Sequence, residues 1–501
     1  MRLLQRFALV YLFLVCFFSC KTDTNNETEV NSAEKYEAFV KAMDEQGIAT
    51  GNLLVYKDGE VIFRSAHGLR SIDPLDSLDL NSQFRLASVS KQFTGMAIMK
   101  LKEKGKIDYD QKVNSILSDF PYDNITVRHL LHHTSGLTDY ERIIADHFDR
   151  EDPNKQYILG NNEILDVFYR VDPDLDFQPG ERWEYSNTGY LVLATIVETV
   201  SGQHFRDFLK EQIFDPVGMT NTTLYQYQIE ADPNMPNRVY GYRTALNQKD
   251  LISNDYDIVN DVRGDGGIFS TLDDLYKWNM ALANHTIIPK SYLDEAWTTG
   301  KTNGGENTSY GFGWFLDYDP GNPVVVNHSG GWVGFATFLQ NEVDKKNGFV
   351  ILTNNSSEYV GAIFRNLFAL SSGEDFELPK KSIRTALAKK IFNEDISSAL
   401  AYYTEVKLNN PDDFNFDEAE LNILGYNLMN DERLDDALEI FKLNMEQFPE
   451  SANPYDSYGD ALLAKGDTLQ ALENFKKCFS MDSTLIYSKD KIDALEAIFT
   501  R

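Results

Sequence analysis

Cysteine is nearly absent from this chain of 501 residues, which contains only Cys16, Cys20 and Cys478. The first two fall in an apparent export signal, so Cys478 has no partner and a disulfide framework is excluded. Basic residues are also few, with 47 Lys and Arg against 77 Asp and Glu and a net charge of −30. This charge repels phosphate backbones and anionic membrane surfaces, which argues against nucleic-acid binding.

Long hydrophobic runs are missing as well, apart from residues 7–18. Arg2 and Arg6 precede this run, which is too short for a membrane span of about 20 residues but typical of a secretory signal. It ends in Ser19-Cys20, which resembles a bacterial lipobox, whose cysteine is lipidated and becomes the new N-terminus. An ordinary signal cleaved nearby is the alternative.

The N-terminal region is therefore predicted to consist of a lipoprotein signal peptide over residues 1–20, with lipidation of Cys20, and a flexible polar tether over residues 21–34. We expect an exported protein of the bacterial cell envelope. It would be held on the outer membrane by the lipid alone and would face the periplasm or the exterior.

Clusters of glycine and proline are lacking too, since the 31 Gly and 15 Pro are scattered and 42% of the residues are hydrophobic. This composition excludes a disordered or fibrous chain. The length, at about 150 residues per domain, predicts about three folding units. A G-x-S-x-G sequence is also absent, which excludes the nucleophile turn of the α/β-hydrolases.

Strand patterns occur at both ends of the segment 35–373. Residues 51–57 and 60–66 flank Asp58-Gly59, a strong hairpin signal, and residues 323–327, 335–341 and 349–353 also have strand composition. The sequence between them is mostly helical, including 92–102, 162–169, 190–200 and 273–282. We predict an α/β (α+β) domain, with an antiparallel sheet built from both ends, helices on its faces and an inserted helical subdomain.

A 34-residue period marks the C-terminal region. It relates Gly425 to Gly459, Ala437 to Ala471 and Phe441 to Phe475. This is the tetratricopeptide period, and the alternative is a chance helical hairpin. We predict a helical linker over residues 374–416 and an all-α tetratricopeptide-like module over residues 417–501, with a capping helix near 492–499. Such a module could bind a protein partner.

The first candidate catalytic pair is Ser88 and Lys91, at the start of a predicted helix. Three residues of helix return to nearly the same face, so the Lys91 amine can reach the Ser88 hydroxyl. The positive end of the helix dipole favours a developing oxyanion, so a serine could be activated without histidine. The pattern is short, and an N-cap serine followed by a surface lysine is the alternative.

Two further motifs follow in the chain. Tyr185 and Asn187 lie two residues apart after a Pro-Gly turn, where a phenol and an amide can face one cleft. His328 and Gly330 alternate onto one face of a predicted strand, and the glycines there would let a substrate backbone approach the strand edge. Taken singly, these could be a core tyrosine beside a capping asparagine, and a histidine at a strand end.

Together the three motifs resemble the S-x-x-K, Y-x-N and K/H-[ST]-G boxes of the serine penicillin-recognising hydrolases, in particular the class C β-lactamase and D-alanyl-D-alanine peptidase branch. The boxes occur in the family's order, and the resemblance covers about two-thirds of the chain. Three more stretches are similar to the family, at residues 126–137, 266–271 and 310–314.

The resemblance implies an acyl-enzyme mechanism. Ser88 would attack a carbonyl carbon, and Lys91 and Tyr185 would share the proton that it loses. The sequence leaves open which of the two is the general base, because their titrations would be coupled. Asn187 would bind the acyl amide, and the backbone N–H groups of Ser88 and Gly331 would form the oxyanion hole.

His328 and Gly330 would contact substrate, but His328 stands where most true β-lactamases have lysine. A mostly neutral imidazole cannot grip a substrate carboxylate as a permanent cation does, which favours a D,D-peptidase, esterase or amidase. His129, His132 and His133 have helical spacing, yet they fit a structural stretch of the family, so no metal and no cofactor are predicted. Asp273 and Asp274 fit a helix cap after Thr271.

The sequence thus predicts an exported serine hydrolase that acts on a small acyl, peptide or ester substrate through acyl-Ser88. Two other functions stay open. One is a penicillin-binding or sensor protein that acylates without efficient turnover. The other is an interaction protein whose repeats bind partners while the hydrolase domain is an inactive scaffold.

Overall fold

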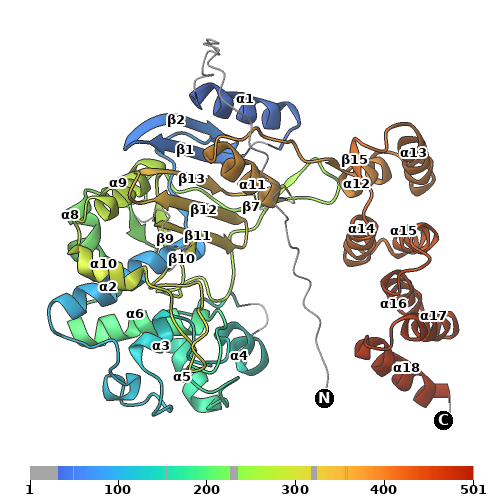
Figure 1. Cartoon of the computed structure of the whole chain (residues 1–501). Helices are drawn as coiled ribbons and strands as arrows, with labels where there is room; N and C mark the ends of the chain where they lie inside the picture. The colour runs from blue at the N-terminus through green and yellow to red at the C-terminus, as the bar shows by residue number, and fades with distance from the viewer. Residues whose placement is uncertain are drawn as a thin grey trace, which may run out of the picture.

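The computed structural model describes residues 32–499 except 49, 151, 153–154, 226–234, 318–323, 356 and 358. The predicted signal peptide, Cys20 and nearly all of the predicted tether lie outside these residues. The described chain forms a sheet domain followed by a separate column of helices (Figure 1). No helix in these described ranges combines the length and apolarity that a membrane crossing needs.

The central sheet joins the two ends of the domain, as predicted. β1 (Gly51–Lys57) and β2 (Glu60–His67) form the expected hairpin, whose turn residues Asp58 and Gly59 have φ angles of 52° and 79°. The strand order is β10-β11-β12-β13-β1-β2. Strand β1 therefore pairs with a strand almost 300 residues later, with Leu54 opposite Val350. The remaining strands are β10 (Phe315–Asp317), β11 (Val325–Trp332), β12 (Phe335–Glu342) and β13 (Asn347–Thr353).

Apolar side chains alternate between the two faces of the sheet. On β13, Phe349 and Ile351 pack under α1 (Ser32–Glu45) and α11 (Val360–Ser371), whereas Val350 and Leu352 join the main core on the opposite face. Because side chains in a strand point to alternate faces, a strand buried on both sides needs a continuous apolar run. Both faces are covered by helices in Figure 1.

Helices between the two sets of strands build the opposite side of the domain. The four predicted helices appear as α2 (Lys91–Glu103), α5 (Asn161–Val171), α6 (Asn187–Ser201) and α9 (Leu272–Ala283). The strands β5 (Phe84–Arg85), β9 (Ile268–Ser270) and β6 (Thr223–Leu224) form a small separate sheet. The α/β class with an inserted helical subdomain is confirmed.

The other elements of the domain are short. They are β3 (Leu69–Ile72), β4 (Leu75–Ser77), the 3₁₀ turns η1 (Ala87–Ser90) and η2 (Val113–Ser115), α3 (Val127–Leu131), α4 (Tyr140–His147), α7 (Phe205–Leu209), the π-helical turn η3 (Lys210–Phe214), α8 (Asp215–Val217), β7 (Tyr242–Thr244), β8 (Leu251–Ser253) and α10 (Lys290–Ala296).

The C-terminal region is all-helical apart from one two-strand pairing of β14 (Lys381–Ser382) with β15 (Phe414–Asn415). Its helices are α12 (Ile383–Asn393), α13 (Ile396–Asn409), α14 (Glu418–Asn430), α15 (Leu434–Gln447), α16 (Asn453–Lys465), α17 (Thr468–Met481) and α18 (Ile486–Phe499). Leu387 and Tyr403 of the segment predicted as a linker share a buried core with Leu424 of α14. This linker is therefore the first helical pair of the column.

The residues that carry the 34-residue period make equivalent contacts. A Cβ atom on Gly425 would lie 2.5 Å from the Phe441 ring, and one on Gly459 would lie 2.6 Å from the Phe475 ring. In both pairs, the glycine lets the phenylalanine of the next helix lie directly against the backbone. The period therefore reflects a repeated helix–helix packing, although the tetratricopeptide assignment itself stays a prediction.

Replacing Gly425 by alanine is expected to lower the free energy of unfolding of the helical region by about 1–3 kcal/mol, because overpacking outweighs the gain in helix propensity. Urea unfolding followed by circular dichroism would measure the change. Gly361→Ala on α11 is the matched control, since the nearest atom to its new Cβ lies 3.5 Å away. Equal stability of the Gly425→Ala protein and the parent would contradict the packing argument.

Candidate active site

Ser88 lies in the 3₁₀ turn η1, which continues directly into α2. The preceding residue, Ala87, has a φ of 48°, a left-handed conformation that is costly for a residue other than glycine. Two neighbouring strands hold this turn, since the Leu86 N–H donates to the Ile268 carbonyl oxygen (2.8 Å) and the Leu86 carbonyl accepts from the Thr337 hydroxyl (2.7 Å). The strained turn presents Ser88 to a cleft.

Lys91 is completely buried beside the nucleophile candidate. Its Nζ lies 3.2 Å from Ser88 Oγ, 2.8 Å from Asn187 Oδ1 and 2.9 Å from the carbonyl oxygen of Asp265. Three oxygen partners fix the amine in one place, next to the hydroxyl. The structure thus brings Ser88, Lys91 and Asn187 together from two distant parts of the sequence.

Asn187 does not cap its helix, because Ser186 occupies the N-cap of α6 and its Oγ accepts from the Gly189 N–H at 3.1 Å. The amide of Asn187 is therefore available to the cleft. Tyr185 lies on the other side of Lys91, whose Nζ is 4.9 Å from the centre of the tyrosine ring. The buried Tyr185 hydroxyl has no hydrogen-bond partner within the described ranges, so it does not bond to Ser88 or Lys91 in this structure.

His328 lies behind the cleft, only 1% exposed, and both of its ring nitrogens have partners. Nε2 lies 2.9 Å from the Tyr310 hydroxyl, and Nδ1 lies 2.5 Å from the carbonyl oxygen of Ser329. Burial, with a contribution from Lys91, lowers the pKa of His328 to about 3. The imidazole is therefore neutral at physiological pH, and it is not among the residues that line the cleft. Its predicted contact with substrate stays a prediction.

Gly330 and Gly331 have different environments. A Cβ on Gly330 would lie 2.3 Å from the Leu86 oxygen and 3.1 Å from the Ser88 nitrogen, so β11 packs directly against the turn that contains Ser88. Gly331 has no atom within 4 Å of such a Cβ and lines the cleft together with Ser88. Gly330 thus permits this close packing, and its predicted contact with substrate stays a prediction, while Gly331 faces the open space.

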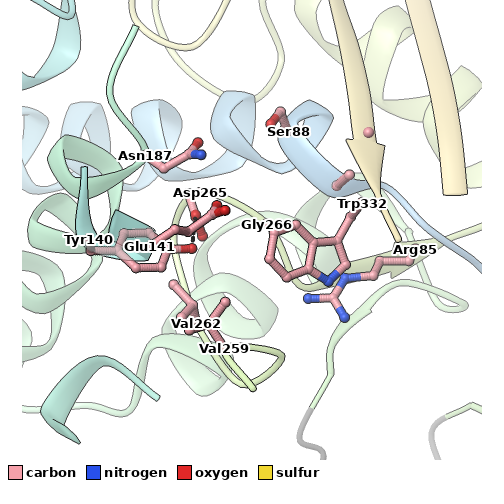
Figure 2. A pocket seen from close by; sticks show the side chains of 12 residues that line it. Arg85, Ser88, Tyr140, Glu141, Asn187, Val259, Val262, Asp265, Gly266 and Trp332 are labelled. Atoms are coloured by element: carbon pink, nitrogen blue, oxygen red, sulfur yellow. Dashed lines mark hydrogen bonds between the residues drawn. The ribbon is translucent and has the colours of Figure 1, made fainter. Parts of the chain in front are cut away.

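The cleft has a volume of about 210 Å³. Figure 2 shows Ser88 and Asn187 on one side of it, Glu141, Asp265 and Tyr140 on the second, and Trp332 and Arg85 on the third. Val259 and Val262 complete the wall opposite Ser88. Sequence reasoning did not identify Arg85, Tyr140, Glu141, Asp265 or Trp332 as site residues, although each lies close to a quoted motif in the chain.

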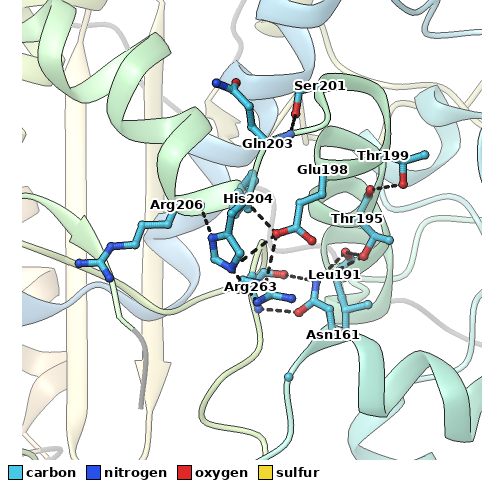
Figure 3. A network of polar contacts seen from close by, with 12 residues as sticks. Asn161, Leu191, Thr195, Glu198, Thr199, Ser201, Gln203, His204, Arg206 and Arg263 are labelled. Atoms are coloured by element: carbon cyan, nitrogen blue, oxygen red, sulfur yellow. Dashed lines mark hydrogen bonds and ion pairs between the residues drawn. The ribbon is translucent and has the colours of Figure 1, made fainter. Parts of the chain in front are cut away.

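Asp265 is a buried carboxylic acid in this cleft. The Tyr140 hydroxyl donates to its Oδ2 at 2.8 Å, and burial raises the pKa of Asp265 despite the nearby Lys91. The backbone beside it is fixed by Asn161, which accepts from the Arg263 N–H at 2.8 Å and donates to the Arg263 carbonyl at 3.1 Å (Figure 3). This network positions the Asp265 carbonyl that holds Lys91.

The three histidines with helical spacing each have a structural partner. His129 completes a capping box with Thr126, His132 Nδ1 lies 3.0 Å from the Tyr310 carbonyl oxygen, and His133 Nδ1 accepts from the Ser186 N–H at 3.1 Å. No group of three or more metal-ligating side chains occurs in the portion of the chain that the structure describes. Thr271 caps α9 through the Asp274 N–H, as predicted.

Comparison with known proteins gives the same assignment as these motifs. The family model described as Beta-lactamase matches residues 37–373. The chain belongs to the beta-lactamase family. It is 33% identical over 373 residues to Penicillin-binding protein 4* of Bacillus subtilis (strain 168), a match that covers 71% of this chain and 81% of that protein.

Solved structures of the beta-lactamase family have the same fold. An octameric penicillin-binding protein homologue from Pyrococcus abyssi superposes with a TM-score of 0.56 at 25% identity, over 68% of this chain and 77% of that one. A class C beta-lactamase matches with a TM-score of 0.55 at 19% identity, over 70% of this chain and 99% of that one. The matched family segment ends before the helical column.

Proposed function

We propose that this protein is a serine hydrolase that cleaves an ester or amide through an acyl-Ser88 intermediate. The observation that carries the proposal is the 3.2 Å approach of Lys91 Nζ to Ser88 Oγ in a cleft that also contains Asn187. A buried amine at this distance can take the hydroxyl proton as the oxygen attacks.

In the proposed first step, Ser88 Oγ forms a bond to the substrate carbonyl carbon and its proton moves to Lys91 or Tyr185. The leaving group departs with a proton, and water then cleaves the acyl-serine bond to regenerate the hydroxyl. The backbone N–H groups of Ser88 and Gly331 would stabilise the oxyanion, an effect worth a few kcal/mol, on the order of 3.

The neutral His328 favours a D,D-peptidase or esterase-like activity over β-lactam hydrolysis. A substrate carboxylate would find no permanent cation at this position, because the pKa of the buried imidazole is about 3. Relatives with penicillin-binding names support an acylating serine, and Ser88 in its strained turn supports the same chemistry.

The proposal includes export and lipid attachment at Cys20, which rest on the N-terminal sequence. It also includes a tetratricopeptide-like role for the helical column, which the repeated Gly–Phe contacts support. That this column binds a protein partner stays a prediction.

The test uses the full chain expressed in bacteria and purified from membranes, beside its Ser88→Ala variant. Chromogenic esters, a cephalosporin and D-Ala-D-Ala peptides are supplied, and product formation and intact mass are followed. We expect turnover that is lost in Ser88→Ala, and a mass that shows removal of the signal and a lipid on Cys20. A stable adduct without turnover would support a penicillin-binding protein instead. The absence of both an adduct and turnover would refute the hydrolase.

A further inference from the structure

Two carboxylates lie on the same wall of the cleft. Glu141 is the second residue of α4, and Asp265 comes from the loop before β9, yet Figure 2 shows their side chains directed toward the same space beneath Asn187. The two acids are part of the same cleft as Ser88, whose hydroxyl already has an amine beside it. The acidic wall therefore faces the site where an acyl group would be held.

Glu141 is the acid that remains available. Its backbone N–H is held by the Asp139 side chain at 2.7 Å, but its own carboxylate has no hydrogen bond or ion pair with any described residue. Burial, with Asp139, Asp265 and Asp257 nearby, raises the pKa of Glu141 to about 7. A cation bound beside this carboxylate would favour its ionised form and relieve the repulsion from its acidic neighbours.

Asp265 is less available, because it is 8% exposed and accepts from the Tyr140 hydroxyl. Asp265 nevertheless contributes to raising the pKa of Glu141 on this wall. Lys91 cannot neutralise Glu141 by direct contact, since its amine is already directed to Ser88, Asn187 and the Asp265 carbonyl.

The other walls of the cleft are formed by apolar side chains and by an arginine that already has hydrogen-bond partners. The Arg85 guanidinium donates to the side chain and backbone oxygens of Asn260 at 2.9 and 3.2 Å, and lies 5.4 Å from the centre of the Trp332 ring. Val259 and Val262 are each 3% exposed and form an apolar wall. A group held here would thus meet one acidic side and a hydrophobic side.

We infer that the acyl group of the substrate carries a protonated amine, which pairs with Glu141, and an apolar side chain that lies against Val259, Val262 and Trp332. The substrate class would be α-aminoacyl esters or amides of small or medium size. This inference rests on the proposed function, since it concerns the acyl group that Ser88 would receive.

An ammonium group fits this wall better than a divalent cation does. A metal ion commonly takes several oxygen ligands, whereas here one carboxylate is free and the other is engaged by Tyr140. An ammonium group needs only three hydrogen-bond acceptors, and water at the exposed mouth of the cleft can supply those that the protein does not. The volume of about 210 Å³ suits a single aminoacyl group.

The experiment compares p-nitrophenyl esters of three kinds of acyl group on the full chain, with spontaneous hydrolysis subtracted. They are the esters of valine (both enantiomers), N-acetylvaline and 3-methylbutanoic acid, which share the apolar side chain and differ in the amine. We expect the better valine enantiomer to have the highest kcat/KM. Glu141→Gln should lower that value about tenfold, as expected for loss of a hydrogen bond to a charged group, and lower the value for the 3-methylbutanoate ester by a much smaller factor.

Asp146→Asn is the matched control, because this exposed acid lies on the same helix but outside the cleft. It should leave all rates unchanged. One outcome would overturn the inference and leave the proposed hydrolase intact. In it, the 3-methylbutanoate ester is hydrolysed in a Ser88-dependent way, and the rate with the valine ester does not change in Glu141→Gln. If none of the esters is hydrolysed in a way that depends on Ser88, both the inference and the proposed hydrolase are overturned.

Discussion

Replacing Lys91 by methionine is expected to lower kcat/KM for the best ester about a thousandfold, in the range typical of losing a general base. Methionine keeps most of the buried volume but has no amine, so Ser88 loses the group 3.2 Å from its hydroxyl. Steady-state rates and the rate of acyl-enzyme formation by mass spectrometry would measure the loss.

The matched control is Lys104→Met, which removes an exposed lysine that follows the last turn of the same helix. This variant should keep the full rate. If Lys91→Met retains the acylation rate of the parent protein while remaining folded, Lys91 is not the base. Tyr185 would then be the remaining candidate from the sequence motifs, since its ring centre lies 4.9 Å from Lys91 Nζ and its hydroxyl has no hydrogen-bond partner among the described residues.

Replacing Gly330 by alanine is expected to lower the same rate about a hundredfold, because a misplacement of about 1 Å at a catalytic group has this size of effect. The new Cβ would lie 2.3 Å from the Leu86 oxygen and 2.5 Å from Thr337 Oγ1, so β11 and the turn that contains Ser88 would have to separate. Rates with the ester and thermal unfolding would be measured together.

Gly304→Ala serves as the control, since the nearest atom to its new Cβ lies 3.6 Å away and it does not line the cleft. It should change neither rate nor stability. A Gly330→Ala protein with the parent's activity would show that the turn at Ser88 tolerates a shift of the strand.

Local patterns predicted much of this fold because they depend on near neighbours in the chain. The Asp58-Gly59 turn requires positive φ angles that these residue types adopt readily, and the hairpin formed as predicted. The placement of Lys91 on the same side as Ser88 follows from their spacing of three residues in a helical turn, and contacts with Asn187 and Asp265 then fix the amine. The pairing of β1 with β13 was predicted only as a general architecture, since its register depends on packing across the whole domain.

Other features depend on tertiary contacts that no local pattern reports. Glu141 and Asp265 have no special spacing, and they meet only because α4 and the loop before β9 converge on one cleft. The burial of His328 depends on Tyr310, from a separate segment. The segment 374–416 was predicted as a helical linker, and the sequence left open whether the repeats lean on residues 385–408 or on the hydrolase domain. The helices of this segment share a core with α14.

The placement of β1 and β11 in one sheet affects when the protein can become active during synthesis. Ser88 emerges from the ribosome early, but Gly331 follows more than 240 residues later and β13 later still. A nascent chain that ends before these strands contains Ser88 without the strand that packs against its turn. The unfinished polypeptide therefore cannot hold Ser88 in its final surroundings until the domain is nearly complete.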